Sequence, residues 1–167
     1  MQELEPPDTH YLSAVMGWLG LGSLADAKAE LALIPPSRQN HPDVLEVRWV
    51  ICAEEKNWQE SLQIARQLLH LAPDRSSGWL HQAYSLRRVP EGGLQAAWDV
   101  LFPAMEKFPK DAIIPYNLAC YACLLQRLDD ARDLVKRAIK VAGREHIRQM
   151  ALSDSDLQPL WDEIREL

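Results

Sequence analysis

The helical pattern of this chain is clearest in residues 114–139, which read IPYNLACYACLLQRLDDARDLVKRAI. Apolar side chains recur there at the spacing of an amphipathic helix, and the pattern restarts after Gln126 and Arg127. We therefore expect two helices joined by a tight turn. Small residues stand where the two backbones would approach each other: Ala119, Ala122, Ala131 and Ala138. Larger apolar residues fill the space around them: Leu118, Leu125, Leu128 and Val135.

The second helix of this stretch recurs along the chain at spacings of 34, 36 and 34 residues. Three columns of small or apolar residues share these steps: Ala27, Ser61, Ala97 and Ala131; Leu31, Ala65, Leu101 and Val135; Ile34, Leu68, Ala104 and Ala138. Helix terminators recur as well, at Pro73, Pro109 and Gly143. Such a period is typical of helix pairs that bury their apolar faces by stacking on copies of themselves.

The period, the small-residue columns and the helix–turn–helix pattern resemble the tetratricopeptide repeat (TPR) over about residues 8–143. The resemblance implies an all-α fold, a right-handed superhelix of four TPR-like helix pairs closed by a C-terminal capping helix. The expected parts are a flexible N-terminal lead-in over 1–8, helix pairs over about 9–41, 42–75, 76–111 and 112–143, and a capping segment over 144–167.

Local signals refine these helices. Pro103 lies inside the helix expected over about 94–108, where a proline removes one hydrogen bond and should bend the helix. We expect the second helix to run over 24–34. In the tail, Ser153 or Ser155 is the expected cap of the last helix, with Pro159 in its first turn.

The composition excludes several classes of function. The 167 residues carry a net charge of -6, which argues against a general affinity for nucleic acid or for anionic membranes. No apolar run approaches the ~18 residues that a membrane-spanning helix needs, and the amino terminus does not resemble a secretory signal. Three cysteines make a poor disulfide framework, so we expect a cytoplasmic protein with reduced thiols.

No set of residues predicts catalysis. The sequence has no Gly-rich phosphate loop, no paired-histidine zinc motif and no Gly-x-Ser-x-Gly turn, so we expect no enzyme activity, metal or cofactor. Cys120 and Cys123 have a spacing seen in metal and redox sites. They fall in mid-helix without a second cysteine pair, and we interpret them as small helix residues. We assign the six tryptophans to the core.

The resemblance implies that the first helix of each pair lines a concave groove that binds extended peptides or partner helices. The partner-binding positions that it transfers to this chain are Leu12, Met16, Val47, Val50, His81, Tyr84, Arg88, Tyr116, Asn117 and Cys120. In related domains that clamp a peptide carboxylate, an asparagine at the place of Asn117 holds the peptide. That clamp also needs lysine, asparagine and arginine at set positions on neighbouring repeats. Leu80 and Tyr84 stand at those places in the repeat before Asn117, and no full repeat follows it, so we do not expect a carboxylate clamp. The alternative is an amide that bonds a neighbouring helix or water.

The function that this pattern favours is protein–protein interaction, by a small adaptor or chaperone-like protein that binds a peptide segment in its groove. One alternative is a self-associating structural module that forms a homodimer. Another is a secretion-type chaperone for a specific client. The apolar half of the groove has its own alternative occupants, namely the chain's first residues or a second copy.

Overall fold

The computed structural model describes residues 3–166, and within that range the chain forms helices and short connections without any β-strand. The predicted all-α class is confirmed. The chain forms two compact units, the first ending at Ser85 and the second beginning at Leu86. No helix of residues 3–166 combines the length and the apolar character that crossing a membrane requires.

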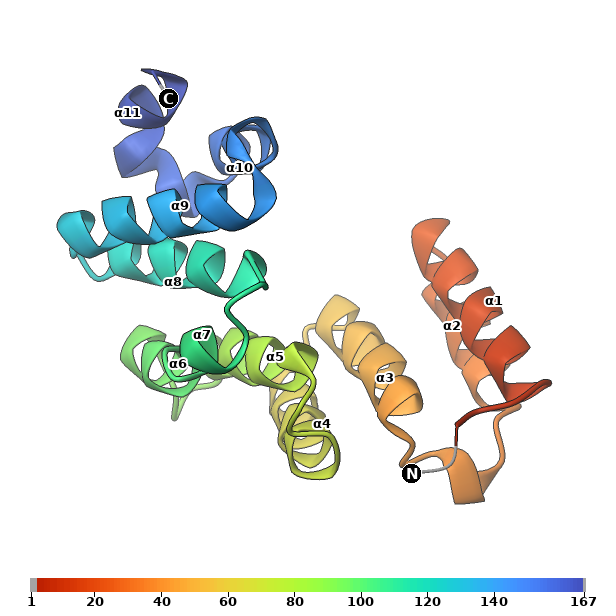
Figure 1. The fold of residues 1–167 in the computed structure, drawn as a ribbon. Coiled ribbons are helices and arrows are strands. Elements are labelled where there is room, and N and C mark those ends of the chain that lie inside the picture. Colours follow the sequence, from red (N-terminus) through yellow and green to blue (C-terminus); the bar gives the residue numbers. More distant parts are fainter. Residues whose placement is uncertain (1–2, 167) are drawn as a thin grey trace. The chain divides into compact units, whose positions relative to one another are not determined.

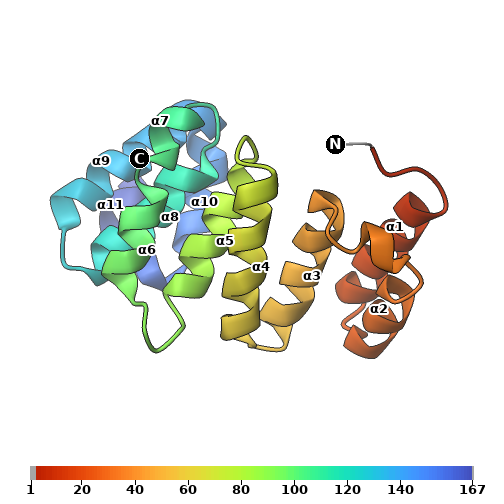
Figure 2. The ribbon, with the colours of Figure 1, turned by 90° about the horizontal axis from the view of Figure 1, so that it is seen from below.

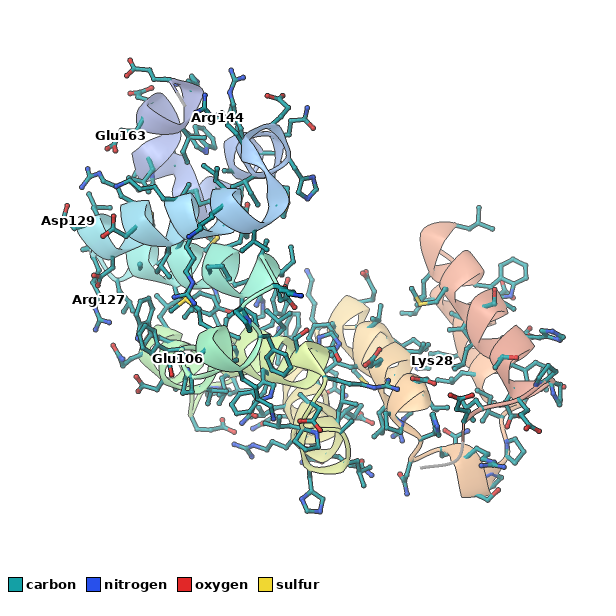
Figure 3. The ribbon with its side chains drawn as sticks, viewed as in Figure 1. Lys28, Glu106, Arg127, Asp129, Arg144 and Glu163 are labelled. Atoms are coloured by element: carbon teal, nitrogen blue, oxygen red, sulfur yellow. The ribbon has the colours of Figure 1, made fainter. Side chains whose placement is uncertain are left out.

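The first unit consists of successive helices that pack in pairs (Figures 1 and 2). The helices are α1 (Asp8–Gly20), α2 (Leu24–Leu31), the 3-10 turn η1 (Pro36–Arg38), α3 (Pro42–Glu54), α4 (Trp58–Leu71) and α5 (Ser76–Leu86). α1 packs on α2 and α3 on α4, while α3 also contacts α1 and α2. The Lys28 Nζ on α2 donates to the Glu55 Oε1 at 2.6 Å and ties α2 to the end of α3 (Figure 3).

The second unit continues the pairs and adds a tail. Its helices are α6 (Leu94–Leu101), α7 (Ala104–Lys107), α8 (Ile113–Leu124), α9 (Leu128–Ala142), α10 (Arg144–Leu152), the 3-10 segment η2 (Ser155–Leu160) and α11 (Trp161–Glu166). α8 packs along α9 and also contacts α6 and α7 (Figure 1). Residues 114–139, from which the fold was predicted, thus form the α8–α9 pair.

The three repeating columns lie inside the protein. Every one of their residues is buried except Leu31, which is half-buried. The first column is the most tightly enclosed, with Ala27, Ser61, Ala97 and Ala131 fully buried. Ser61 fits among the alanines because its hydroxyl donates to the Asn57 carbonyl at 2.9 Å, which satisfies the buried polar group.

The turns between paired helices share one backbone geometry. Gly22, Lys56 and Gln126 all have a left-handed conformation, with φ of 75°, 57° and 62°. The N–H of each following residue reaches back to the carbonyl five residues earlier, at 2.8–2.9 Å, as in a Schellman helix end. The longer turn before α6 makes the matching bond from Gly93 to the Leu86 carbonyl at 2.8 Å.

The longer turn also contains a glycine that has no room for a side chain. A Cβ at Gly92 would lie 2.0 Å from the Leu86 carbonyl oxygen. The backbone must pass close to the end of α5 at this point, and only glycine allows that approach.

The tail packs against the last helix pair. α10 contacts α9, η2 contacts α8, and α11 contacts α10. The tail contributes fully buried side chains, namely Ile147, Leu157, Leu160 and Ile164. Arg132 on α9 holds Glu163 on α11 through its Nε, which donates at 2.8 Å to Oε2, and its Nη1 also donates to Asp129 (Figure 3). The tail therefore packs over the α8–α9 pair of the second unit.

Three local expectations need correction. α2 ends at Leu31, earlier than Ile34, although Ile34 is still buried. At Pro103 the expected helix is interrupted, so that α6 and α7 are separate helices, because Pro103 has no N–H to continue the helical ladder. The residue that caps the tail segment is Asp154, whose Oδ1 accepts from the Asp156 N–H at 3.0 Å, and Pro159 lies within η2.

Candidate functional site

The predicted groove residues of the first unit are mostly part of its interior. Val47 belongs to a buried cluster with Val15, Ala27 and Ile51, and Leu12 packs against that cluster. Val50 packs on a second buried cluster, built around Leu45 and Trp49. Met16 on α1 differs from the others because 49% of it is exposed. Among these four positions, Met16 alone is exposed.

His81 and Tyr84 join an aromatic cluster centred on Trp49. The His81 ring stacks on the Trp49 ring with centroids 3.8 Å apart and planes 6° apart, and Tyr84 meets Trp49 edge-on at 5.7 Å. The Trp49 Nε1 donates to the Ser85 Oγ at 3.0 Å. Burial lowers the pKa of His81 to about 4, so that its imidazole is neutral at pH 7. The neutral His81 ring, stacked on the Trp49 indole, therefore contributes to the packing of this cluster.

The tail covers two of the predicted groove residues on α8. The Tyr116 hydroxyl donates to the Asp154 Oδ2 at 3.0 Å, and the Cys120 thiol lies 3.5 Å from the same oxygen. Both residues are buried. The Asn117 Nδ2 donates to the Ile113 carbonyl at 2.9 Å, within its own helix, so this amide is engaged without a bound peptide. Arg88, which follows α5, is half-buried.

An ion pair fastens the same part of the tail. The Arg87 guanidinium binds the Asp156 carboxylate with both ends, Nη2 donating to Oδ1 at 3.0 Å and Nη1 donating to Oδ2. Its central carbon lies 5.9 Å from the Tyr121 ring centroid. Such two-pronged pairs are among the strongest polar contacts in proteins. From the sequence, the Ser153–Asp156 run is expected to supply a helix cap, and the ion pair between Arg87 and Asp156 is not predicted.

The cluster of Cys120, Asp154 and Asp156 has metal-ligating atoms within 4.8 Å of one another. The charge that a cation would supply is already provided by Arg87. Burial and Asp154 also raise the pKa of the Cys120 thiol far above its usual range, which keeps the thiol protonated. These residues are therefore suited to a salt-bridged contact and poorly suited to a metal.

Exposed apolar residues gather on the first helix pair instead. Trp18, which we had assigned to the core, is 37% exposed, and Leu21 is 77% exposed. The residues at the same positions one repeat later are Cys52 and Glu55. Unlike Trp18, Cys52 is buried, and unlike Leu21, Glu55 is charged. Trp18 is thus exposed, whereas the residue at its place in the next pair is buried.

The outer face of α2 shows the same contrast. Ala25, Ala29 and the following Leu33 are all exposed. The residues 34 positions later, on α4, are three glutamines: Gln59, Gln63 and Gln67. The first pair is thus apolar where the second pair is polar. Within the described part of the lead-in, Glu3 lines a hollow with Asp43 and Arg75, near the start of α3.

Comparisons with solved structures of other proteins agree with the fold described above. No protein-family model matches the chain, and no curated protein matches it in sequence. Among solved structures, a thermophilic TPR protein of Thermus thermophilus is similar with a TM-score of 0.71 and 16% identity, over 96% of this chain and 100% of that one. MamA of Desulfovibrio magneticus RS-1, residues 41 to the end, is similar with a TM-score of 0.66 and 17% identity, over 99% and 97%.

A third similar structure is a much longer chain. It comes from the structure of the APC/C hetero-tetramer Cut9–Hcn1. The likeness has a TM-score of 0.67 and 16% identity, over 92% of this chain and 29% of that one. At such low identities these likenesses concern the fold. They agree with the repeat period and with the paired helices, and the chain has the fold of tetratricopeptide-repeat proteins.

Proposed function

We propose that this protein is a protein–protein interaction module whose first helix pair binds an apolar face of a partner. One observation carries the proposal: the outer face of α2 presents Ala25, Ala29 and Leu33 where α4 presents three glutamines. An apolar surface of this kind is stabilised when a partner removes it from water. The neighbouring helix pair, which carries polar residues at the same repeat positions, shows that the repeat fold does not require apolar residues there.

The chemistry of the surface favours an amphipathic helix as the partner segment. Ala25 and Ala29 lie four residues apart, so their small side chains form a shallow row along which a second helix can approach closely. The neighbouring Asp26 is exposed and Glu30 is half-buried. We therefore expect the partner helix to carry basic residues beside its apolar stripe.

The end of α1 adds two large exposed apolar side chains to the same helix pair. Trp18 and Leu21 are the side chains from which we expect most of the binding energy, because large apolar and aromatic residues dominate such interfaces. Met16, exposed on α1, is the predicted groove residue that remains available for contact with a partner. An adaptor for a peptide or a secretion-type chaperone for one client is a narrower form of this function.

The test compares two doubly substituted proteins. Trp18→Gln with Leu21→Gln removes two of the exposed apolar side chains of the first pair. Leu71→Gln with Phe102→Gln is the control, because these residues are 37% and 45% exposed elsewhere on the chain. Each protein is used to capture partners from the native extract, with quantitative mass spectrometry. Circular dichroism checks that helicity is unchanged.

We expect a partner that is retained by wild type and by the control and lost from the Trp18/Leu21 variant, with an affinity about 30-fold weaker. Equal retention by all three proteins would contradict the proposal. Sedimentation over a range of concentrations distinguishes the alternative of self-association. A dimer that dissociates only in the Trp18/Leu21 variant would make a second copy of this chain the partner.

A further inference from the structure

The second unit contains a hollow that is lined mainly by cations. Its volume is about 830 Å³, and its lining residues are Pro109, Lys110, Lys136, Arg137, Lys140 and Val141. A second hollow of about 630 Å³ shares Pro109 and Lys110 with it and adds Lys107, Phe108, Asp111 and Ala112. The larger hollow has no carboxylate in its lining, although the whole chain carries a net charge of -6.

Two of these cations have no acidic partner in the part of the chain that the structure describes. Among residues 3–166, no carboxylate lies within ion-pair distance of Lys110 or of Lys140, and both are exposed. Lys136 does pair with Asp133 at 3.0 Å, but both side chains are largely exposed, so the pair is weak. Arg137 is held in place because its Nη2 donates to the Met105 carbonyl at 3.2 Å. The positive charge of the hollow is therefore available to a ligand.

Helix electrostatics account for only part of this charge. Lys140 lies in the last turn of α9, where a cation is favoured by the helix dipole. Lys136 and Arg137 lie about one turn earlier on the same helix. Lys110 comes from the segment between α7 and α8, a different part of the chain. Two separate segments thus bring cations to one hollow.

We propose that this hollow binds an acidic peptide segment of a partner protein. Four cations spread along its walls suit several carboxylates in a row better than a single phosphate. Pro109 and the 38%-exposed Val141 add apolar contact for an aliphatic side chain between the carboxylates. The negative charge of the rest of the protein repels long polyanions and anionic membranes, whereas a short peptide meets only the hollow.

The proposal is independent of the first helix pair and is tested with a defined probe. The probe is a fluorescein-labelled peptide with four Asp or Glu residues around one Leu, and its binding to the full chain is followed by fluorescence anisotropy at low and at high salt. Lys110→Gln with Lys140→Gln removes the two unpaired charges. Lys56→Gln with Arg66→Gln is the matched control, because these exposed residues lie on the first unit and the net charge changes equally.

We expect the Lys110/Lys140 variant to bind the peptide at least ~10-fold more weakly, and the control to differ from wild type by less than ~2-fold. Binding should weaken as salt rises. Absence of peptide binding by wild type at low salt would overturn the proposal, as would equal weakening in both variants. Tripolyphosphate, phosphatidylserine vesicles and a DNA duplex serve as competitors. Tighter binding of any of these through Lys110 and Lys140 would also overturn it, because the ligand would then belong to another class.

Discussion

Acidification should destabilise the folded protein through His81. The ordinary pKa of histidine is 6.5, and burial lowers that of His81 to about 4. As the pH falls below 6.5, the unfolded chain binds a proton that the folded imidazole does not yet accept. The contribution of neutral His81 is therefore complete above 6.5 and is lost progressively as the pH falls toward 4. Between about pH 7 and pH 5 the free energy of unfolding should decrease by about 2 kcal/mol.

Urea unfolding followed by circular dichroism at several pH values measures this effect. His81→Gln removes the titrating group, so its free energy of unfolding should change less between pH 7 and pH 5 than that of wild type. The variant should be less stable at pH 7, by about 1 kcal/mol, because the stack on Trp49 is lost. His146→Gln, at an exposed position, controls for the removal of one imidazole. The same pH dependence in wild type and in His81→Gln would refute the reasoning.

Three further substitutions test the turns and the tail through urea unfolding. Lys56→Gly should raise the free energy of unfolding by about 1 kcal/mol, because glycine adopts a φ of 57° without strain; no gain would show that the turn is relaxed. Gly92→Ala should lower it by about 2 kcal/mol or more, since the Cβ would meet the Leu86 carbonyl oxygen, and a neutral result would contradict that close approach. Asp156→Asn should lower it by about 2 kcal/mol, and a double-mutant cycle with Arg87→Met should show coupling; independent effects would mean that the ion pair does not hold the tail.

The repeat period made the helix pairs predictable. Each turn lies at the same place in the period, and a left-handed residue at Gly22, Lys56 and Gln126 follows from the shared helix-end geometry. The column of small residues that begins at Ala27 was predictable for a similar reason. Two helix backbones approach closely only where side chains are small, and this requirement recurs in every helix pair. Such features repeat within the sequence, so each occurrence supports the others.

The covered part of α8 was not predictable in this way. Tyr116 and Asp154 lie 38 residues apart, and Arg87 and Asp156 lie 69 apart, in a tail that has no counterpart in the repeats. Family resemblance assigned Tyr116 and Cys120 to an open groove, but it carries no information on a tail that packs over them.

Hydrogen–deuterium exchange with a captured partner would test most directly whether the first helix pair is the binding surface. Deuterium uptake is compared for the protein alone and for the protein with its partner, peptide by peptide. The proposed function predicts that protection concentrates in residues 8–33, which contain the exposed Trp18, Leu21 and Leu33. Partner-dependent protection that leaves residues 8–33 unchanged would contradict it and would place the interaction elsewhere on the chain.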